Sequence, residues 1–320
     1  MKAAVGDSRS PAAAIAPAAV PLPGSVRRRI PRYAAGYAFV APVLLYLAVT
    51  ALYPIVNVIT MSVNDVTGGR WYFVGLAQYG QVLGDPVLWN ALRNTAIFTV
   101  ASTAVHLTLG MSFALLLHEV WFSRTLRNAT RGALIMPWVF STAAAGLMWS
   151  LLYHPFGLLN YVAVGVLHRP QPIEFLGDPR FALASVIAVN VWKSYPFYMV
   201  AILGELQAIP ADLFDAAKVD GAGGPQRFWY VTLPQLRGIL IAISTLDVIT
   251  TFGHVDLVNI LTRGGPGRAT ETLAFHVYRT ALLDGNLPKA AAVSNVMLIV
   301  LTLFTWLYLR VLSRRGREAW

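Results

Sequence analysis

The stretch IPADLFDAAKVDGAGGPQRFWYVTLPQL, from Ile209 to Leu236, decides how the rest of the chain is organised. It is a polar passage between two strongly apolar blocks, in a sequence with only 12% charged residues. Pro210 suits the start of a helix, where its missing N–H costs nothing. The glycine-rich run from Gly221 to Gly224 ends such a helix and permits a sharp turn. The pattern predicts a helix–turn–helix between two membrane segments, which is either a docking element or an ordinary solvated loop.

Composition places the chain in a membrane. It has 320 residues, of which 56% are hydrophobic, and its mean hydropathy of +0.57 exceeds that of ordinary soluble domains. The net charge of +10 could suggest nucleic acid, but the basic residues lie in the tails and at loop ends, which favours membrane topology. The absence of cysteine excludes disulfides, thiolate-held iron–sulfur clusters and cysteine-based zinc sites.

Apolar runs of about 20 residues predict an all-α, polytopic protein with six transmembrane helices. The expected spans are residues 33–58, 94–117, 133–152, 181–206, 236–261 and 290–309. Between the first two spans we expect a turn-rich loop with a short interfacial helix, and residues 153–180 form a second loop on the same side. This divides the chain into a disordered basic tail (1–32), a transmembrane domain (33–312) that contains the loop 207–236, and a second basic tail (313–320).

Most of the 25 lysines and arginines fall on one side of these spans. They are in the N-terminal tail, the loop with Arg124, Arg127 and Arg131, the opening stretch, and the C-terminal tail. Because cytoplasmic loops carry an excess of Lys and Arg, both termini and the opening stretch are predicted to be cytoplasmic.

Several kinds of chemistry have no sequence signature here. No phosphate-binding P-loop occurs, so if ATP drives this protein, another chain must bind it. The six histidines show no metal-ligand spacing, and no nucleophile elbow or dinucleotide fingerprint is present. The sequence therefore predicts neither a catalytic nor a metal site in this chain.

Ionisable residues at membrane depth are costly and usually face a cavity or a partner. Lys193 and Asp247 qualify, and His254 and Asp256 are further candidates. Lys193 lies beside aromatic residues and Pro196, which frees backbone carbonyls, so it could face a polyhydroxylated ligand. The alternative is a structural pair of Lys193 with Asp247 or Asp256 that joins two spans. A second buried candidate is His106, which we expect to be a packed or hydrogen-bonded helix residue.

The opening stretch closely resembles the cytoplasmic loop signature of permease subunits of binding-protein-dependent ABC importers. The matching positions are Asp215, Ala216, Ala217, Gly221, Leu233 and Pro234, with Asp220 just before the glycine. Asp215 stands where the family usually has Glu, so the charge is kept on a side chain one methylene shorter. The resemblance implies the type I importer permease fold, with this loop contacting an ATPase.

Other stretches are similar to the carbohydrate branch of that family, of the maltose and glycerol-phosphate type. They include FVGLAQYGQVL, VWKSYPFYMV and LTRGGPGRAT with HVYRTA, so the resemblance covers about residues 35–312. It implies a multi-pass protein of the bacterial cytoplasmic membrane that translocates a sugar by alternating access. The implied partners are a second permease, two ATPase subunits that bind ATP and Mg, an external solute-binding protein, and lipid, but no nucleic acid.

By the same resemblance, the substrate path lies on the spans at residues 181–206, 236–261 and 290–309. The candidates are Trp192, Lys193, Tyr195, Asp247, Thr250, His254, Asp256 and Asn259. One alternative substrate is glycerol 3-phosphate or a glycerophosphodiester, although a phosphate would favour more cationic groups than Lys193 alone. A different alternative is a membrane-embedded enzyme that uses Asp247 and His254.

Overall fold

A computed structural model describes residues 34–67, 69–118 and 123–314, and the chain forms two units, residues 1–54 and 55–320. The first unit contains helix α1 (Ala34–Leu47), a π-helical turn (Ala48–Leu52) and the start of α2 (Tyr53–Ser62). The helical run Phe39–Ser62 is long and apolar enough to cross a membrane, as expected for the first span. The predicted tail 1–32 lies outside the described residues.

The second unit contains the remaining helices and one small hairpin. Its first part comprises β1 (Asn64–Thr67), β2 (Arg70–Phe73), α3 (Ala77–Gly84), α4 (Pro86–His118), α5 (Arg124–Val139), α6 (Thr142–Leu152) and α7 (Leu158–Asn160). Its second part comprises α8 (Pro179–Ala208), α9 (Ala211–Val219), α10 (Gly224–Arg227), α11 (Leu233–Phe252), α12 (Asp256–Leu261), α13 (Leu273–Tyr278) and α14 (Leu287–Arg314). Three π-helical turns follow α7, α10 and α13, at Tyr161–Val166, Phe228–Thr232 and Arg279–Leu283.

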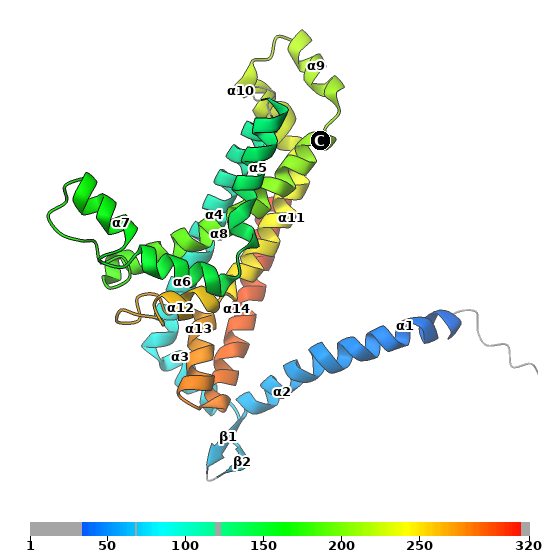
Figure 1. Cartoon of the computed structure of the whole chain (residues 1–320). Coiled ribbons are helices and arrows are strands. Elements are labelled where there is room, and N and C mark those ends of the chain that lie inside the picture. Colours follow the sequence, from blue (N-terminus) through cyan, green and yellow to red (C-terminus); the bar gives the residue numbers. More distant parts are fainter. Residues whose placement is uncertain (1–33, 68, 119–122, 315–320) are drawn as a thin grey trace, which may run out of the picture. The chain divides into compact units, whose positions relative to one another are not determined.

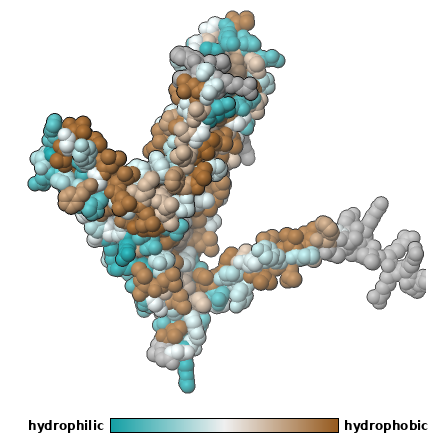
Figure 2. Space-filling view, in the orientation of Figure 1, coloured by the Kyte–Doolittle hydropathy of each residue, from teal (hydrophilic) through white to brown (hydrophobic). Residues whose placement is uncertain are grey.

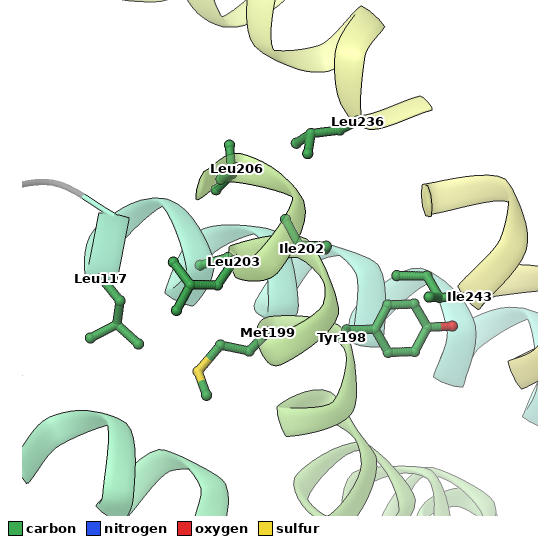
Figure 3. Close-up of a cluster of buried hydrophobic side chains, with 9 residues drawn as sticks. Leu117, Tyr198, Met199, Ile202, Leu203, Leu206, Leu236 and Ile243 are labelled. Carbon is green, nitrogen blue, oxygen red and sulfur yellow. The ribbon is translucent and has the colours of Figure 1, made fainter. Parts of the chain in front are cut away.

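The long helices α4 and α8 pack against each other along their length (Figure 1). Gly110 of α4 makes this possible, because a Cβ placed there would collide with the Cβ of Tyr198 on α8. Small residues allow such close backbone approach between helices in lipid. Beside this contact, Tyr198, Met199 and Leu236 belong to a buried cluster that joins α4, α8 and α11 (Figure 3).

The ends of several helices meet at one end of this unit. Leu117 near the end of α4, Leu206 near the end of α8 and Leu236 near the start of α11 share the buried cluster of Figure 3. Helices α9 and α10 lie at this same end (Figure 1). On the surface beyond, apolar residues cover much of the long helices (Figure 2), as expected for helices that face lipid.

The predicted third span is a bent pair of helices rather than one straight helix. Helices α5 and α6 form an angle of 98°. Pro137 interrupts the hydrogen-bond ladder near the end of α5, Phe140 is extended, and Ser141 caps α6 through a bond from the Ala144 N–H to its hydroxyl (3.1 Å). Helix α6 packs closely against α12, since a Cβ on Gly146 would lie 2.8 Å from Ile260.

The predicted fifth span, residues 236–261, is also interrupted. Helix α11 ends at Phe252, with Gly253 at its C-cap, and α12 begins only at Asp256. Glycine is a frequent terminator because it has little preference for continuing a helix. The sixth span is longer than predicted: α14 continues to Arg314, inside the stretch assigned to the second tail, and residues 315–320 lie outside the described residues.

The fold is mostly helical, and the part of the chain that the structure describes has five long candidate spans, or six if α5 and α6 together form one. The expectation of an all-α protein was wrong in one place. Strands β1 and β2 pair antiparallel, with Asn64 opposite Phe73 and Thr67 opposite Arg70. Gly69, just before β2, has a positive φ of 77°, which glycine adopts at low cost. The expected short helix in this loop is α3.

Candidate functional site

The predicted helix–turn–helix is present as α9 and α10. Pro210 is the N-cap residue rather than a residue of the first turn, and α9 ends at Val219. The N–H of Ala222 bonds to the carbonyl oxygen of Ala217 (2.9 Å), and that of Gly221 bonds to the carbonyl oxygen of Lys218 (3.0 Å). Gly221 has a φ of 80°, so the helix ends in a Schellman motif that a glycine is suited to form.

The side chains predicted for coupling are presented outward. Asp215, Ala216, Asp220 and Gly221 are exposed, and Ala217 is half-buried. Leu233 and Pro234 open α11, after the π-helical turn that follows α10. The arrangement places one short helix, joined to the bundle by turns at both ends, at the surface of the second unit (Figure 1).

The charges of α9 are paired only locally. Lys218 donates to Asp215 across one helical turn at 2.8 Å, and 66% of the Asp215 side chain is exposed to solvent. An exposed pair of this kind contributes about 0–1 kcal/mol to stability. The Asp215 carboxylate can therefore exchange Lys218 for a group on another protein at little cost to the fold.

The path candidates fall into two sets. Trp192 and Tyr195 line an apolar groove of about 460 Å³ between α4 and α8, together with Phe113 of α4. The Tyr195 hydroxyl donates to the carbonyl oxygen of Leu134 on α5 (3.1 Å), and the Trp192 ring packs edge-on against Trp149 of α6. This set is an aromatic wall held in place by three helices.

The second set surrounds the break between α11 and α12. Lys193, Asp247 and Asp256 lie close enough to His254 for their charges to act on it. Thr250 at the end of α11 is exposed and donates to the carbonyl oxygen of Leu246, and Asn259 on α12 is half-buried. The break in the predicted fifth span thus gathers four of the ionisable candidates.

Asp247 contacts His106, a partner that was not predicted for it from the sequence. Its Oδ2 lies 3.0 Å from Nδ1 of His106 on α4 and accepts the Thr103 hydroxyl (2.7 Å), and its Oδ1 accepts the Thr251 hydroxyl (3.1 Å). His106 Nε2 lies 3.3 Å from the carbonyl oxygen of Asn190 on α8. Since that carbonyl can only accept, Nε2 is the donor in that contact, and Nδ1 faces the carboxylate of Asp247.

This network changes the interpretation of two residues. His106 is completely buried and hydrogen-bonded, as expected, and Asp247 is 8% exposed. The suggested pairing of Lys193 with Asp247 or Asp256 was wrong, because within the described residues no salt bridge includes Lys193. Asp247 instead joins α11 to α4 and, through His106, to α8.

The profile of the family described as "Binding-protein-dependent transport system inner membrane component" matches residues 106–317. The chain belongs to this family of permeases. The permease is thus a multi-pass inner-membrane component of a binding-protein-dependent transport system, and it transports rather than catalyses. An enzyme based on Asp247 and His254 is excluded.

Two curated relatives align with nearly the whole permease. The trehalose/maltose transport system permease protein MalF of Thermococcus litoralis is 34% identical, over 86% of this chain and 92% of its own. The sn-glycerol-3-phosphate transport system permease protein UgpA of Agrobacterium fabrum is 31% identical, over 87% and 94%. A solved bacterial alginate ABC transporter, bound to a periplasmic protein that carries an alginate pentasaccharide, has a chain of the same fold. Its TM-score is 0.75 at 19% identity, over 89% of this chain and 95% of its own.

A second buried polar cluster of the permease was not foreseen. Glu271 is completely buried, and its carboxylate lies 2.7 Å from His276 Nδ1, 3.7 Å from Arg268 Nε and 3.8 Å from Arg279 Nη1. The backbone around it is bound to α4, because the Asn94 amide donates to the carbonyl oxygens of Arg268 and Glu271, both at 3.1 Å. The sequence offered little signal, since an acidic residue in a glycine-rich loop is usually solvated.

Within the described residues no group of three or more His, Cys, Asp or Glu side chains is arranged to hold a metal ion. The two buried acidic groups instead have protein partners. Asp247 contacts His106 and threonine hydroxyls, and Glu271 contacts His276 and two arginines. These two clusters hold helices and loops together, whereas the aromatic groove and α9 present groups that a ligand or partner can reach.

Proposed function

We propose that the permease carries a sugar or sugar derivative across the inner membrane by alternating access, driven by ATP and Mg bound on two partner ATPase subunits. The relative that transports trehalose and maltose supports a sugar substrate, as does the wall of Trp192, Tyr195 and Phe113. Aromatic faces suit the apolar faces of sugar rings, and the nearby break after α11 supplies polar groups.

The observation that carries the coupling part of the proposal is the exposed helix α9 with its Schellman turn. It carries Lys218 and is followed by Arg227 of α10, and an excess of Lys and Arg supports a cytoplasmic position for this loop. The basic residues of the two tails support the same side for both chain termini. A short helix with an exposed acidic residue, Asp215, can enter a groove on the ATPase and transmit its movement to α8 and α11. A second, similar permease subunit completes the path.

Affinity purification of the tagged permease in mild detergent tests the coupling assignment. We expect two ATPase copies and a second permease to copurify, and the yield of ATPase to fall when residues 212–220 are replaced by a glycine–serine segment of equal length. The matched control is the same replacement of residues 168–176, in the loop before α8. Purification of the intact permease without any ATPase would contradict the proposal.

Glycerol 3-phosphate or a glycerophosphodiester is the second candidate, because UgpA is 31% identical over most of both chains. Lys193 is the cation that could meet a phosphate in the path. Uptake assays with radiolabelled disaccharide and glycerol 3-phosphate, in vesicles holding the whole complex and its binding protein, separate the two. A Lys193→Gln variant should reduce glycerol 3-phosphate uptake much more than sugar uptake if phosphate is the substrate.

A further inference from the structure

Two adjoining grooves lie at the end of the permease where α9 is found. The first has a volume of about 590 Å³. Its lining includes His118 of α4, Lys218 of α9, Arg227 of α10, and Phe228 and Trp229 of the turn that follows. Three of these residues carry basic groups, and none of the described lining residues carries a carboxylate.

The second groove, of about 290 Å³, is almost entirely apolar and continues the first. Phe228 and Trp229 line both grooves. From there the second groove follows α4 from Met111 to Leu107, and its other wall comes from Leu233, Leu240 and Ser244 of α11 and Tyr308 of α14. One end of the combined surface is therefore basic, and the rest is apolar and lies along a membrane span.

The basic end has an unused hydrogen-bond donor. Arg227 Nε is shielded from solvent and has no hydrogen-bond partner in the described part of the chain, although the residue as a whole is only half-buried. Lys218 has Asp215 as its partner, which lies outside the lining of the groove. A buried guanidinium donor that lacks an acceptor is unfavourable, so an anionic group in this groove would be stabilised by it.

The dimensions match one leaflet of a bilayer. An α-helix rises 1.5 Å per residue, so the lining of α4 from His118 to Leu107 spans about 16 Å, which is about half of the ~30 Å hydrocarbon thickness. Trp229, which is 62% exposed, lies where the two grooves meet. Tryptophan is enriched at this level, between the head groups and the acyl chains.

We propose that the two grooves together bind one anionic phospholipid. Its phosphate contacts Arg227, with His118 and Lys218 nearby, and one acyl chain lies in the apolar groove along α4. A soluble anion would use only the basic groove, and an apolar peptide would use only the second. An amphiphile with a negative head group uses both. The bound lipid would join α4, α10 and α11 at the base of α9, and so connect the lipid composition of the membrane to this helix.

The test measures retained lipid rather than transport, so its outcome does not depend on the identity of the substrate. The whole complex is delipidated in detergent and exchanged into nanodiscs of phosphatidylcholine with or without phosphatidylglycerol. Native mass spectrometry then counts the lipids that stay bound. We expect one tightly held phosphatidylglycerol and no phosphatidylcholine, and the intact mass in the same spectrum reports assembly of the complex.

Two variants locate the site. Arg227→Gln should weaken phosphatidylglycerol retention about tenfold, the effect of losing one charge-assisted hydrogen bond. The control Arg169→Gln removes an exposed arginine elsewhere and should retain the lipid fully. Thr108→Phe fills the apolar groove and should reduce retention of long-chain phosphatidylglycerol more than of a short-chain form.

Three results would overturn the proposal. Equal retention by Arg227→Gln and Arg169→Gln would place the lipid elsewhere. Complete displacement of phosphatidylglycerol by inorganic phosphate alone would assign the basic groove to a soluble anion. Absence of any retained phosphatidylglycerol in an intact complex would show that a protein subunit covers the grooves.

Discussion

Helix α9 and the cluster around Asp247 use charged residues in opposite ways. On α9, Asp215 is exposed and its partner Lys218 lies three residues away on the same helix. In the bundle, Asp247 is buried and its partner His106 lies on another helix, 141 residues earlier in the chain. The first arrangement leaves a charge available to another protein, whereas the second occupies the charge inside the fold.

The difference teaches which ionisable residues of a permease are accessible to ligands or partners. An acidic residue at membrane depth suggests a substrate contact, yet every oxygen of the Asp247 carboxylate already accepts a bond from the protein. Removing a buried partner leaves an uncompensated charge, while removing an exposed one costs little. Substitutions in the two regions should therefore separate folding from coupling.

The largest effect is expected from Gly221→Pro, at the turn that ends α9. Gly221 has a φ of 80°, whereas proline requires about −65°, and proline also lacks the N–H that bonds to Lys218. We expect uptake to fall to background while the protein still inserts into the membrane at normal levels. The matched control is Gly221→Asn, since asparagine tolerates positive φ and should retain most uptake. Normal uptake by the proline variant would show that this turn does not couple ATP hydrolysis to transport.

Next in size is Asp247→Ala, which breaks the buried pair. His106, Thr103 and Thr251 would lose their shared acceptor, and breaking a buried pair costs about 3 kcal/mol. Thermal unfolding of the purified protein in detergent should show a clear fall in midpoint. Asp256→Ala, at an exposed position near the start of α12, should leave the midpoint almost unchanged. Equal midpoints for the two variants would mean that the His106–Asp247 contact adds no stability.

Asp215→Ala should act on assembly instead. Its loss removes one exposed ion pair, so the unfolding midpoint should change little. Recovery of the ATPase with the tagged permease should fall about tenfold if the carboxylate makes one charge-assisted contact. The control is Asp212→Ala, an exposed acid in the first turn of the same helix. The role of Asp215 would be rejected if both variants recover as much ATPase as the unaltered protein.

The smallest effect concerns Lys289, which donates to Asp85 at 3.2 Å between α14 and the start of α4. Burial alone would raise the pKa of Asp85, but bonds from the Val87 N–H and from Lys289 outweigh it and lower the pKa. A lowered folded-state pKa gives stability that is present above the unfolded value of about 3.9 and is lost as pH falls below it. Lys289→Met should therefore cost no more than about 1 kcal/mol at neutral pH.

A series of thermal unfolding measurements from pH 7 to pH 3 checks this sign. The difference in midpoint between the Lys289→Met variant and the unaltered protein should shrink as the pH falls below about 4. A constant difference across the series would mean that Lys289 stabilises the protein by packing of its aliphatic stem rather than by its charge.

The parts of the fold that could be predicted are those set by local signals. Pro210, Gly221 and Pro225 lie within one short stretch, and each acts on its own backbone, so α9, its terminal turn and α10 followed from sequence. The membrane spans in α4, α8 and α14 could likewise be predicted, because the hydropathy and the length of an apolar run are properties of one segment.

The parts that could not be predicted depend on distant residues or on competing signals. Nothing in the sequence near Asp247 indicates His106, because the pairing arises only when α4 packs against α11. The hairpin β1–β2 is too short to show alternation, and the break after Phe252 has only Gly253 as a local cause. The bend of 98° could not be derived from Pro137, because proline indicates a weak point and not an angle.

The contact of Gly110 with Tyr198 has a consequence for the transport cycle. Leu107 lies one turn before the glycine on the same face of α4, and Phe113 and Ala114 lie one turn after it, so a shift of α4 along α8 by one turn would bring a side chain into a space that has no room for a Cβ. Sliding between these two helices is therefore blocked in both directions. We expect α4 and α8 to move as one rigid body during the cycle, with the bends at α5–α6 and α11–α12 acting as hinges.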